Sequence, residues 1–257
     1  MANKALLVGI NSYRGCPLQG CVNDIFNTLK RITTPADPRY GFLSNDITQL
    51  LDNDADTSNW KDALQGLVAN AKPLDRLYFH YSGHGATADN CDLPGQFQNC
   101  VCPVDFDFTP EHMITDQFFH QLFSTLPDGV IFNWVSDSCH SADLDRRMTK
   151  RIHRARLFTG SKDRRNQTRT IVPGALTNVA LLSGCGLDQT SADSQDPATG
   201  QPCGACTWAY LTALSELPAS APWTQISQLT NRILAQHSYT QQTDPDGGRI
   251  AKPMLQA

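Results

Sequence analysis

The sequence lacks any hydrophobic run of the roughly 18 to 20 apolar residues that a membrane-spanning helix needs. Its first residues, MANKALLVGINSY, also lack the longer apolar stretch and small-residue cleavage site of a secretory signal. We therefore predict a buried strand at this point of the chain. We also expect a cytoplasmic protein that does not act at a membrane.

An excess of charge of one sign is missing too. The chain has 21 Lys and Arg residues against 25 Asp and Glu residues, and the formal net charge of −4 argues against nucleic acid as the main partner. No internal repeat and no second domain boundary is visible. The 257 residues, 40% of them hydrophobic, suffice for one α/β domain with a full core. We predict one domain over residues 1–257, and a monomer.

Cysteines are present in an odd number and without regular pairing. A cytoplasmic compartment is reducing, so we do not expect a full disulfide framework, and at least one thiol must be unpaired. The nine cysteines are Cys16, Cys21, Cys91, Cys100, Cys102, Cys139, Cys185, Cys203 and Cys206.

Short apolar runs alternate with stretches of helical period. The runs predict strands over residues 4–10, 46–52, 75–85, 129–139 and 178–186, with a short last strand over 252–256. Helices are predicted over residues 20–32, 56–71, 115–126, 206–217 and 223–238. This alternation is typical of an α/β fold with a mostly parallel central sheet covered by helices on both faces.

Two reactive-looking turns each follow a predicted strand. HYSGHG ends with His84 and Gly85, and SDSC ends with Cys139. Ligand sites of parallel sheets lie beyond the carboxyl ends of the strands, so both turns should share one rim. His84 could take the thiol proton of Cys139, and the Gly85 and Cys139 amides could form an oxyanion hole. Glycines at 83 and 85 would let the backbone pass close to a substrate.

More ordinary explanations stay open for both residues. A cysteine after an apolar strand is often a small core residue, and a histidine at a strand end is often a satisfied polar one. His140 is a competing base, although adjacent residues rarely point at each other.

Asp137 lies two residues before Cys139, so on an extended strand its side chain points to the same side. A carboxylate beside the nucleophile suits a cationic substrate side chain, guanidinium as a bidentate partner or ammonium as a point charge. The alternative is a strand-end cap for the following helix. Asp24 has a similar alternative, as a common acid in the first turn of a helix.

Several segments together resemble the caspase-like fold of clan CD cysteine peptidases, and more narrowly metacaspases and the bacterial orthocaspases. They are ALLVGINSY, LQGCVNDI, LYFHYSGHG, PVDF, SDSCHSADL, LLSGCGLDQTSAD and GACTWAYLTAL. The resemblance covers nearly the whole chain in order. It implies a caspase-like three-layer αβα sandwich and cleavage after Arg or Lys. It also implies a substrate pocket formed by Cys21, Asp24, Ser82 and Asp137.

The resemblance divides the domain into a large-subunit-like part (1–145) with the dyad and a small-subunit-like part (171–257). Between them, residues 146–170 are dense in basic residues and almost free of acids, which is typical of a solvated, mobile linker. An enzyme that cuts after Arg or Lys should cut itself there, most readily after Lys150, Arg151 or Arg165. The alternative is an uncut loop that keeps the protein soluble.

Many metacaspases require Ca²⁺, and four aspartates here could supply oxygen ligands. They are Asp92, Asp116, Asp143 and Asp145. This set is smaller than is usual in the family. Zinc on Cys91, Cys100, Cys102, Cys203 and Cys206 is an alternative, but C-x-C with a distant C-x-x-C is a poor structural zinc pattern.

We therefore predict a cysteine endopeptidase that acts on proteins or peptides. The alternative is a non-proteolytic interaction module on the same fold, in which the dyad would typically be broken. A cysteine-dependent phosphatase is excluded by spacing, because its loop needs Arg six residues after the nucleophile and Asp145 stands there.

Overall fold

The computed structural model describes residues 1–34, 40–89, 97–138, 154–155, 177–186 and 189–254. A central sheet of six strands organises them, in the order β12-β9-β7-β3-β1-β2. The strands are β1 (Asn3–Gly9), β2 (Ile47–Leu51), β3 (Arg76–Ser82), β7 (Ile131–Asp137), β9 (Val179–Ser183) and β12 (Asp244–Asp246). All neighbours pair in parallel except β12, which runs antiparallel to β9. The predicted, mostly parallel sheet is confirmed.

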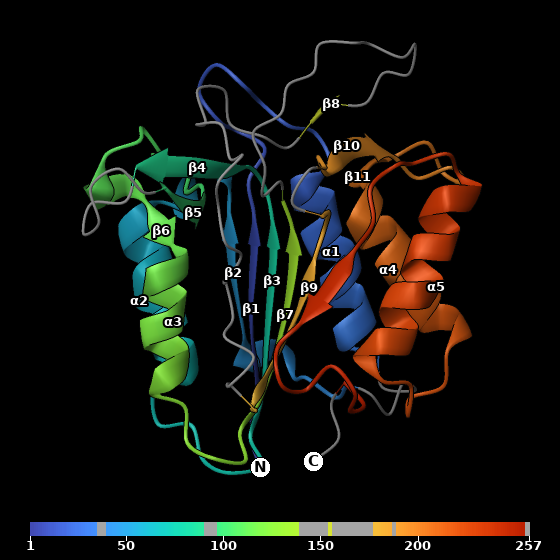
Figure 1. Cartoon of the computed structure of the whole chain (residues 1–257). Coiled ribbons are helices and arrows are strands. Elements are labelled where there is room, and N and C mark those ends of the chain that lie inside the picture. Colours follow the sequence, from blue (N-terminus) through green and yellow to red (C-terminus); the bar gives the residue numbers. More distant parts are fainter. Residues whose placement is uncertain (35–39, 90–96, 139–153, 156–176, 187–188, 255–257) are drawn as a thin grey trace.

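Helices cover both faces of this sheet (Figure 1). On one face lie α2 (Thr57–Val68) and α3 (Asp116–Ser124), and on the other α1 (Cys21–Ile32), α4 (Ala205–Glu216) and α5 (Trp223–Gln236). β3 shows how alternation builds both layers. Phe79 packs in one core cluster with Trp60 of α2, and its neighbour Tyr78 packs in another with Tyr210 and Trp223. The three-layer αβα sandwich is therefore confirmed.

Two small sheets lie beyond the carboxyl ends of the central strands, at the top of Figure 1. One contains β4 (Gly85–Asp89), β5 (Phe97–Val101) and β6 (Ile114–Thr115). The other contains β8 (Arg154–Ala155), β10 (Ala192–Gln195) and β11 (Pro202–Gly204). β8 falls inside the predicted basic linker, so two residues of that linker pair with β10. Three short 3₁₀ helices complete the described elements: η1 (Ser44–Asp46), η2 (Asp52–Asp54) and η3 (Pro110–His112).

The predicted last strand at 252–256 is wrong. Its described residues form a turn in which Pro253 makes a single bridge to Pro222. Proline has no N–H to donate to a ladder. The last strand is instead β12, whose sequence, Asp-Pro-Asp, has no apolar signal. Along the part of the chain that the structure describes, no helix is both long and apolar enough to span a bilayer.

Candidate active site

The predicted rim forms where β3 and β7 end side by side. Ser82 and Asp137, the last residues of these strands, are direct partners in the ladder. His84 follows β3 by two residues, and Ser138 leads from β7 toward Cys139. Cys139 itself lies outside the described residues. Eight other candidate residues also lie outside the described residues: His140, Cys91, Asp92, Asp143, Asp145, Lys150, Arg151 and Arg165.

The His84 side chain is oriented by a loop that precedes α1. Its Nε2 lies 2.8 Å from the carbonyl oxygen of Cys16. A carbonyl can only accept, so Nε2 carries the hydrogen and Nδ1 is the basic ring nitrogen. The ring packs on Tyr13, with centroids 4.5 Å apart, and the residue is 2% exposed. Residue spacing gave no sign of the Cys16 contact, because every residue has a backbone carbonyl.

The backbone of His84 is fixed as well. The Cys102 N–H donates to the His84 carbonyl at 3.0 Å, and the Tyr81 hydroxyl donates to the same oxygen. In an antiparallel ladder, hydrogen-bonded and non-hydrogen-bonded pairs alternate. His84 and Cys102 form a hydrogen-bonded pair, so the next pair, Gly85 with Val101, is a non-hydrogen-bonded pair. It follows that the Gly85 N–H points away from β5.

Two buried tyrosines explain Gly83. The hydroxyls of Tyr13 and Tyr81 lie 3.0 Å apart, and burial raises the pKa of both well above the ordinary value, so both stay neutral. A Cβ on Gly83 would overlap both hydroxyl oxygens. Packing therefore requires glycine here, a different reason from the substrate approach that the sequence suggested.

Asp24 and Ser82, two residues of the pocket that the resemblance implies, are in contact. The Ser82 hydroxyl donates to Asp24 Oδ2 at 2.6 Å, and the Gly204 N–H donates to both carboxylate oxygens at 2.8 and 3.0 Å. Asp24 is fully buried in the first turn of α1, three residues after Cys21. The first-turn position of Asp24 is therefore confirmed, and its role in a substrate pocket stays a prediction.

Asp137 is held in a similar way. Its Oδ1 accepts the Ser191 hydroxyl at 2.6 Å, and its Oδ2 accepts the N–H and the hydroxyl of Thr207, both at 2.8 Å. Gly204, the N-cap of α4, has no side chain to cap the helix. Asp24 and Asp137 therefore take up the first N–H groups of α4, where the helix dipole favours negative charge. Asp137 does cap a helix, as the alternative explanation expected. The helix is α4, which is distant in sequence, and not the segment that directly follows Asp137.

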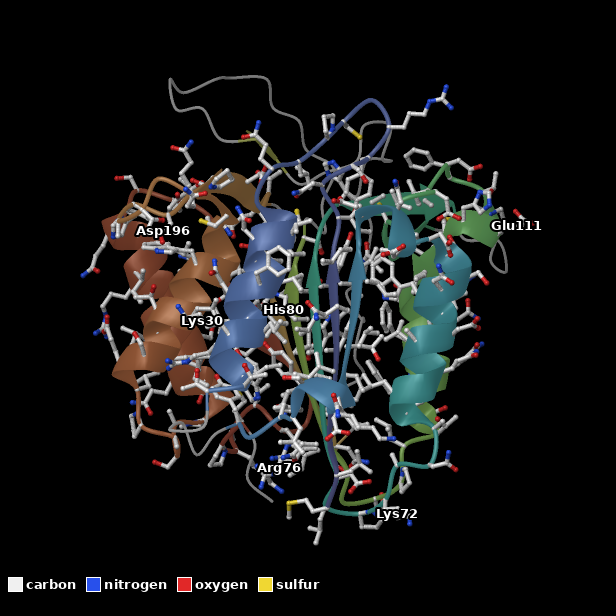
Figure 2. All side chains as sticks on the ribbon, turned by 180° about the vertical axis from the view of Figure 1, so that it is seen from behind. Lys30, Lys72, Arg76, His80, Glu111 and Asp196 are labelled. Atoms are coloured by element: carbon white, nitrogen blue, oxygen red, sulfur yellow. The ribbon has the colours of Figure 1, made fainter. Side chains whose placement is uncertain are left out.

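A second histidine, His80, belongs to the core. It lies between the central sheet and α1 (Figure 2), with Nδ1 3.1 Å from the Thr28 hydroxyl and Nε2 3.2 Å from that of Thr207. Thr207 gives its hydroxyl hydrogen to Asp137, so it accepts from His80 Nε2–H. A chain of hydrogen bonds thus connects the Asp137 carboxylate with the interior of the sheet.

A pocket of about 380 Å³ lies between α1 and α4. Asp24 and Asn27 line it from α1, Thr207 and Trp208 from α4, and Asp196 from the turn after β10. Among the described residues of this lining, none is basic, so two carboxylates set its charge.

The proposed metal ligands are represented by Asp116 alone within the described ranges. It opens α3, and its Oδ1 accepts the Gln117 N–H at 2.9 Å. Across the described residues, no three His, Cys, Asp or Glu side chains come together as a metal site. Because Cys91, Asp92, Asp143 and Asp145 lie outside these residues, the calcium set and the alternative zinc set stay predictions.

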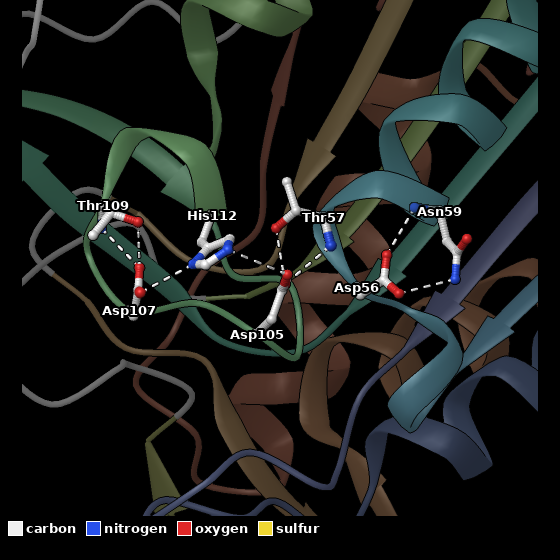
Figure 3. A network of polar contacts seen from close by, with 7 residues as sticks. All are labelled: Asp56, Thr57, Asn59, Asp105, Asp107, Thr109 and His112. Atoms are coloured by element: carbon white, nitrogen blue, oxygen red, sulfur yellow. Dashed lines mark hydrogen bonds and ion pairs between the residues drawn. The ribbon is translucent and has the colours of Figure 1, made fainter.

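A polar network on the loop before η3 anchors α2 (Figure 3). Asp105 accepts the N–H and hydroxyl of Thr57 at 2.9 and 2.8 Å. Asp107 pairs with His112 Nδ1 at 2.9 Å and accepts the Thr109 hydroxyl at 2.6 Å. The hydrogen bonds from Thr109 and His112 lower the pKa of Asp107 to about 2, and Asp107 raises the pKa of His112 above 6.5.

The three-layer αβα sandwich carries His84 just after β3 and the buried Asp137 at the end of β7. This fold and this pair of positions place the protein in the class of caspase-like proteins. A family model described as "Metacaspase, peptidase C14 domain" matches residues 3–145, more than half of the chain. The chain belongs to the metacaspase family.

Relatives agree with this assignment, and a solved structure has a similar fold. Metacaspase-1 of Kluyveromyces lactis is 30% identical over 287 residues, covering 93% of this chain and 64% of that protein. Metacaspase-7 of Arabidopsis thaliana is 39% identical over 156 residues, covering 56% of this chain and 36% of that protein. This chain thus spans less than two thirds of either relative. In fold, it is similar to protein GSU0716 from Geobacter sulfurreducens, with a TM-score of 0.70 at 20% identity, covering 100% of this chain and 99% of that one.

Proposed function

We propose that the chain is a cysteine endopeptidase in which Cys139 is the nucleophile and His84 the base. The observation that carries this proposal is the hydrogen bond from His84 Nε2 to the Cys16 carbonyl. This bond presents Nδ1 as the proton acceptor, at the rim where β7 leads to residue 139.

In the proposed reaction, Nδ1 takes the Cys139 thiol proton and the thiolate attacks the scissile carbonyl carbon. The peptide C–N bond then breaks, the leaving amine takes the proton from Nδ1, and a thioester remains. Water attacks the thioester with Nδ1 as base, and the carboxylic acid and thiol are released. Protein or peptide substrates are the partners that this chemistry implies.

The amides of Gly85 and Cys139 are the proposed oxyanion hole. Two donors tie the His84 carbonyl to β5 and Tyr81, and the Gly85 N–H faces the other way. A fixed donor stabilises developing charge better than a mobile one, because nothing must reorganise during the reaction.

The proposed specificity is for Arg or Lys at the cleaved bond. Asp24 on α1 and Asp137 at the end of β7 are two buried carboxylates, with Ser82 and Cys21 beside Asp24. The negative charge of these carboxylates suits a cationic substrate side chain, guanidinium as a bidentate partner or ammonium as a point charge. A substrate carboxylate facing these acids would cost several kcal/mol.

Self-cleavage in the basic linker and activation by Ca²⁺ extend the proposal. The cleavage candidates are Lys150, Arg151 and Arg165, and the proposed ligands are Asp92, Asp116, Asp143 and Asp145. The position of β8 is relevant to self-cleavage. The candidate bonds after Lys150 and Arg151 precede this strand, and the bond after Arg165 follows it.

The deciding experiment compares fluorogenic peptides that end in Arg, Lys or Asp, with and without Ca²⁺. Wild type should cleave the Arg and Lys peptides orders of magnitude faster than the Asp peptide, and Cys139→Ala and His84→Ala should be inactive but folded. A preference for Asp would refute the assigned pocket. Substantial activity in Cys139→Ala would show that another residue is the nucleophile. A folded wild type that cleaves none of these peptides would favour the non-proteolytic alternative.

Self-cleavage needs its own comparison. Wild type and Cys139→Ala are incubated side by side, resolved on a denaturing gel, and the new N-termini sequenced. Cleavage after the linker residues in wild type only supports the proposal. A wild-type chain that stays intact while it cleaves an Arg peptide rules out self-processing.

A further inference from the structure

The loop that orients His84, residues 11–20, is held at both of its ends by carboxylates from other elements. At its start, Asp52 accepts the N–H groups of Asn11 and Ser12 at 2.7 and 2.9 Å. At its end, Asp193 accepts the N–H groups of Gln19 and Gly20 at 2.8 and 2.9 Å. The carboxylates of Asp52 and Asp193 thus fix the loop on the N-terminal and the C-terminal side of Cys16.

The anchor at Asp193 is a close fit. A Cβ on Gly20 would come within 2.5 to 2.8 Å of the Cys203 backbone and of Asp193 Oδ1, so the loop lies directly against β10 and β11. Asp193 is 6% exposed, and little water can replace its carboxylate. Moving Asp193 would therefore move the Gln19–Gly20 peptide.

The Asn11 side chain makes the loop one unit. Its Oδ1 accepts the Cys21 N–H at 2.9 Å, and its Nδ2 donates to the Gln19 carbonyl at 3.3 Å. The Leu18 N–H closes the same ring on the Asn11 carbonyl at 2.9 Å. With the two ends joined in this way, a shift at Gly20 is passed on to the Cys16 carbonyl between them.

We propose that Asp193 is a positioning residue for the reaction. It holds the 11–20 loop so that the Cys16 carbonyl keeps the proton of His84 on Nε2 and the ring turned for proton transfer at Nδ1. The proposal rests on the proposed role of His84 as the base. It means that β10, in the small-subunit-like part, helps to set the geometry of a histidine in the large-subunit-like part.

Asp75 provides a matched control for a merely structural carboxylate. It is 7% exposed and accepts two backbone N–H groups, those of Ala2 at 2.6 Å and Lys72 at 2.9 Å. It lies before β3, at the opposite end of the sheet from His84. Asp75→Asn should therefore weaken the fold much as Asp193→Asn does, without disturbing the 11–20 loop.

The kinetic test measures kcat and KM on an Arg peptide for both variants. For Asp193→Asn we expect kcat to fall by roughly 10²-fold, as for an ångström-scale misplacement of a catalytic group, with KM within about twofold. Asp75→Asn should keep the wild-type kcat. Asp52→Asn is the second loop variant, and asparagine suits its φ of +48°. Asp52→Asn should also lower kcat. If Asp193→Asn does not fold, the kcat of Asp52→Asn shows whether the loop positions His84.

A second readout needs no activity. In ¹⁵N-histidine-labelled Cys139→Ala protein, with His84→Ala identifying the signal, His84 should be the Nε2–H tautomer. Adding Asp193→Asn or Asp52→Asn should produce a tautomer mixture, and adding Asp75→Asn should not. If His84→Ala keeps its activity, the proposed base is wrong, and the tautomer still tests the anchor. Wild-type kcat and tautomer in the loop variants would overturn the inference, as would equal losses in Asp75→Asn.

Discussion

Replacing Asp137 by alanine removes one acceptor from three buried donors: the Ser191 hydroxyl and the N–H and hydroxyl of Thr207. The Thr207 N–H cannot turn elsewhere, and an unsatisfied buried donor costs about 1–3 kcal/mol. The two hydroxyls can rotate toward other acceptors, but each loses a charge-assisted bond of about 1.5–3 kcal/mol. We expect Asp137→Ala to lower the free energy of unfolding by about 3–5 kcal/mol, a large share of the roughly 5–15 kcal/mol that holds a domain together.

The assay is urea unfolding in the Cys139→Ala background, which prevents self-cleavage from confounding the transition. Thr207→Val removes one of the three hydrogen bonds and also the acceptor of His80 Nε2–H, so it should cost about 1–3 kcal/mol. Asp137→Asn keeps one acceptor but turns an amide N–H₂ toward donors, so its loss should fall in between. A change below about 1 kcal/mol for Asp137→Ala, or a larger loss for Thr207→Val, would refute the claim that Asp137 caps α4.

Three further predictions concern packing, pH and metal. Gly83→Ala should destabilise the fold by about 1–3 kcal/mol through overlap with two tyrosine hydroxyls, whereas Gly66→Ala, in open space on α2, should not, as thermal unfolding would show. In an NMR titration, the pair of Asp107 and His112 should be complete between about pH 4 and 6.5. It should be lost as pH rises through the raised pKa of His112 or falls toward 2 at Asp107, and an ordinary His112 pKa would contradict it. If Ca²⁺ activates the enzyme, a chelator should reduce peptide cleavage and added Ca²⁺ restore it, while full activity in excess chelator would exclude this requirement.

Five strands of the central sheet and the five α-helices among the described residues were predictable because their apolar periodicity is strong, whereas β12 has no such signal. Trp60, Phe79 and Tyr210 are buried in the structure on elements that the pattern predicted. The small sheets were not predictable in this way. β10 is short and mostly polar, and β11 is Pro-Cys-Gly, so the neighbours they pair with, not their composition, make them strands.

In the candidate site, too, some residues were predictable from the sequence and others were not. His84, Asp24, Ser82 and Asp137 were predicted from motifs, and the structure brings Asp24 and Ser82 into contact. Their partners were missed for a physical reason. The Cys16 carbonyl and the Gly204 N–H are backbone groups, and residue identity says nothing about where such groups point. Asp193 had a signal, since it ends the segment LLSGCGLDQTSAD that resembles metacaspases, but only the fold shows which groups its carboxylate binds.

The capping of α4 also constrains the order in which the site can form during synthesis. The Gly204 N–H that Asp24 binds is synthesised 180 positions after Asp24, and the Thr207 N–H that Asp137 binds is synthesised 70 positions after Asp137. At the usual translation rate of about 5–20 residues per second, the ribosome needs roughly 10–40 s to cover the longer interval. During that time the acids of the proposed pocket have no helix to cap, and the 11–20 loop has no β10 to rest on. A nascent chain that carries both His84 and Cys139 would therefore still lack the geometry that the proposed dyad needs, which would delay the proposed proteolysis until the last third of the protein has emerged.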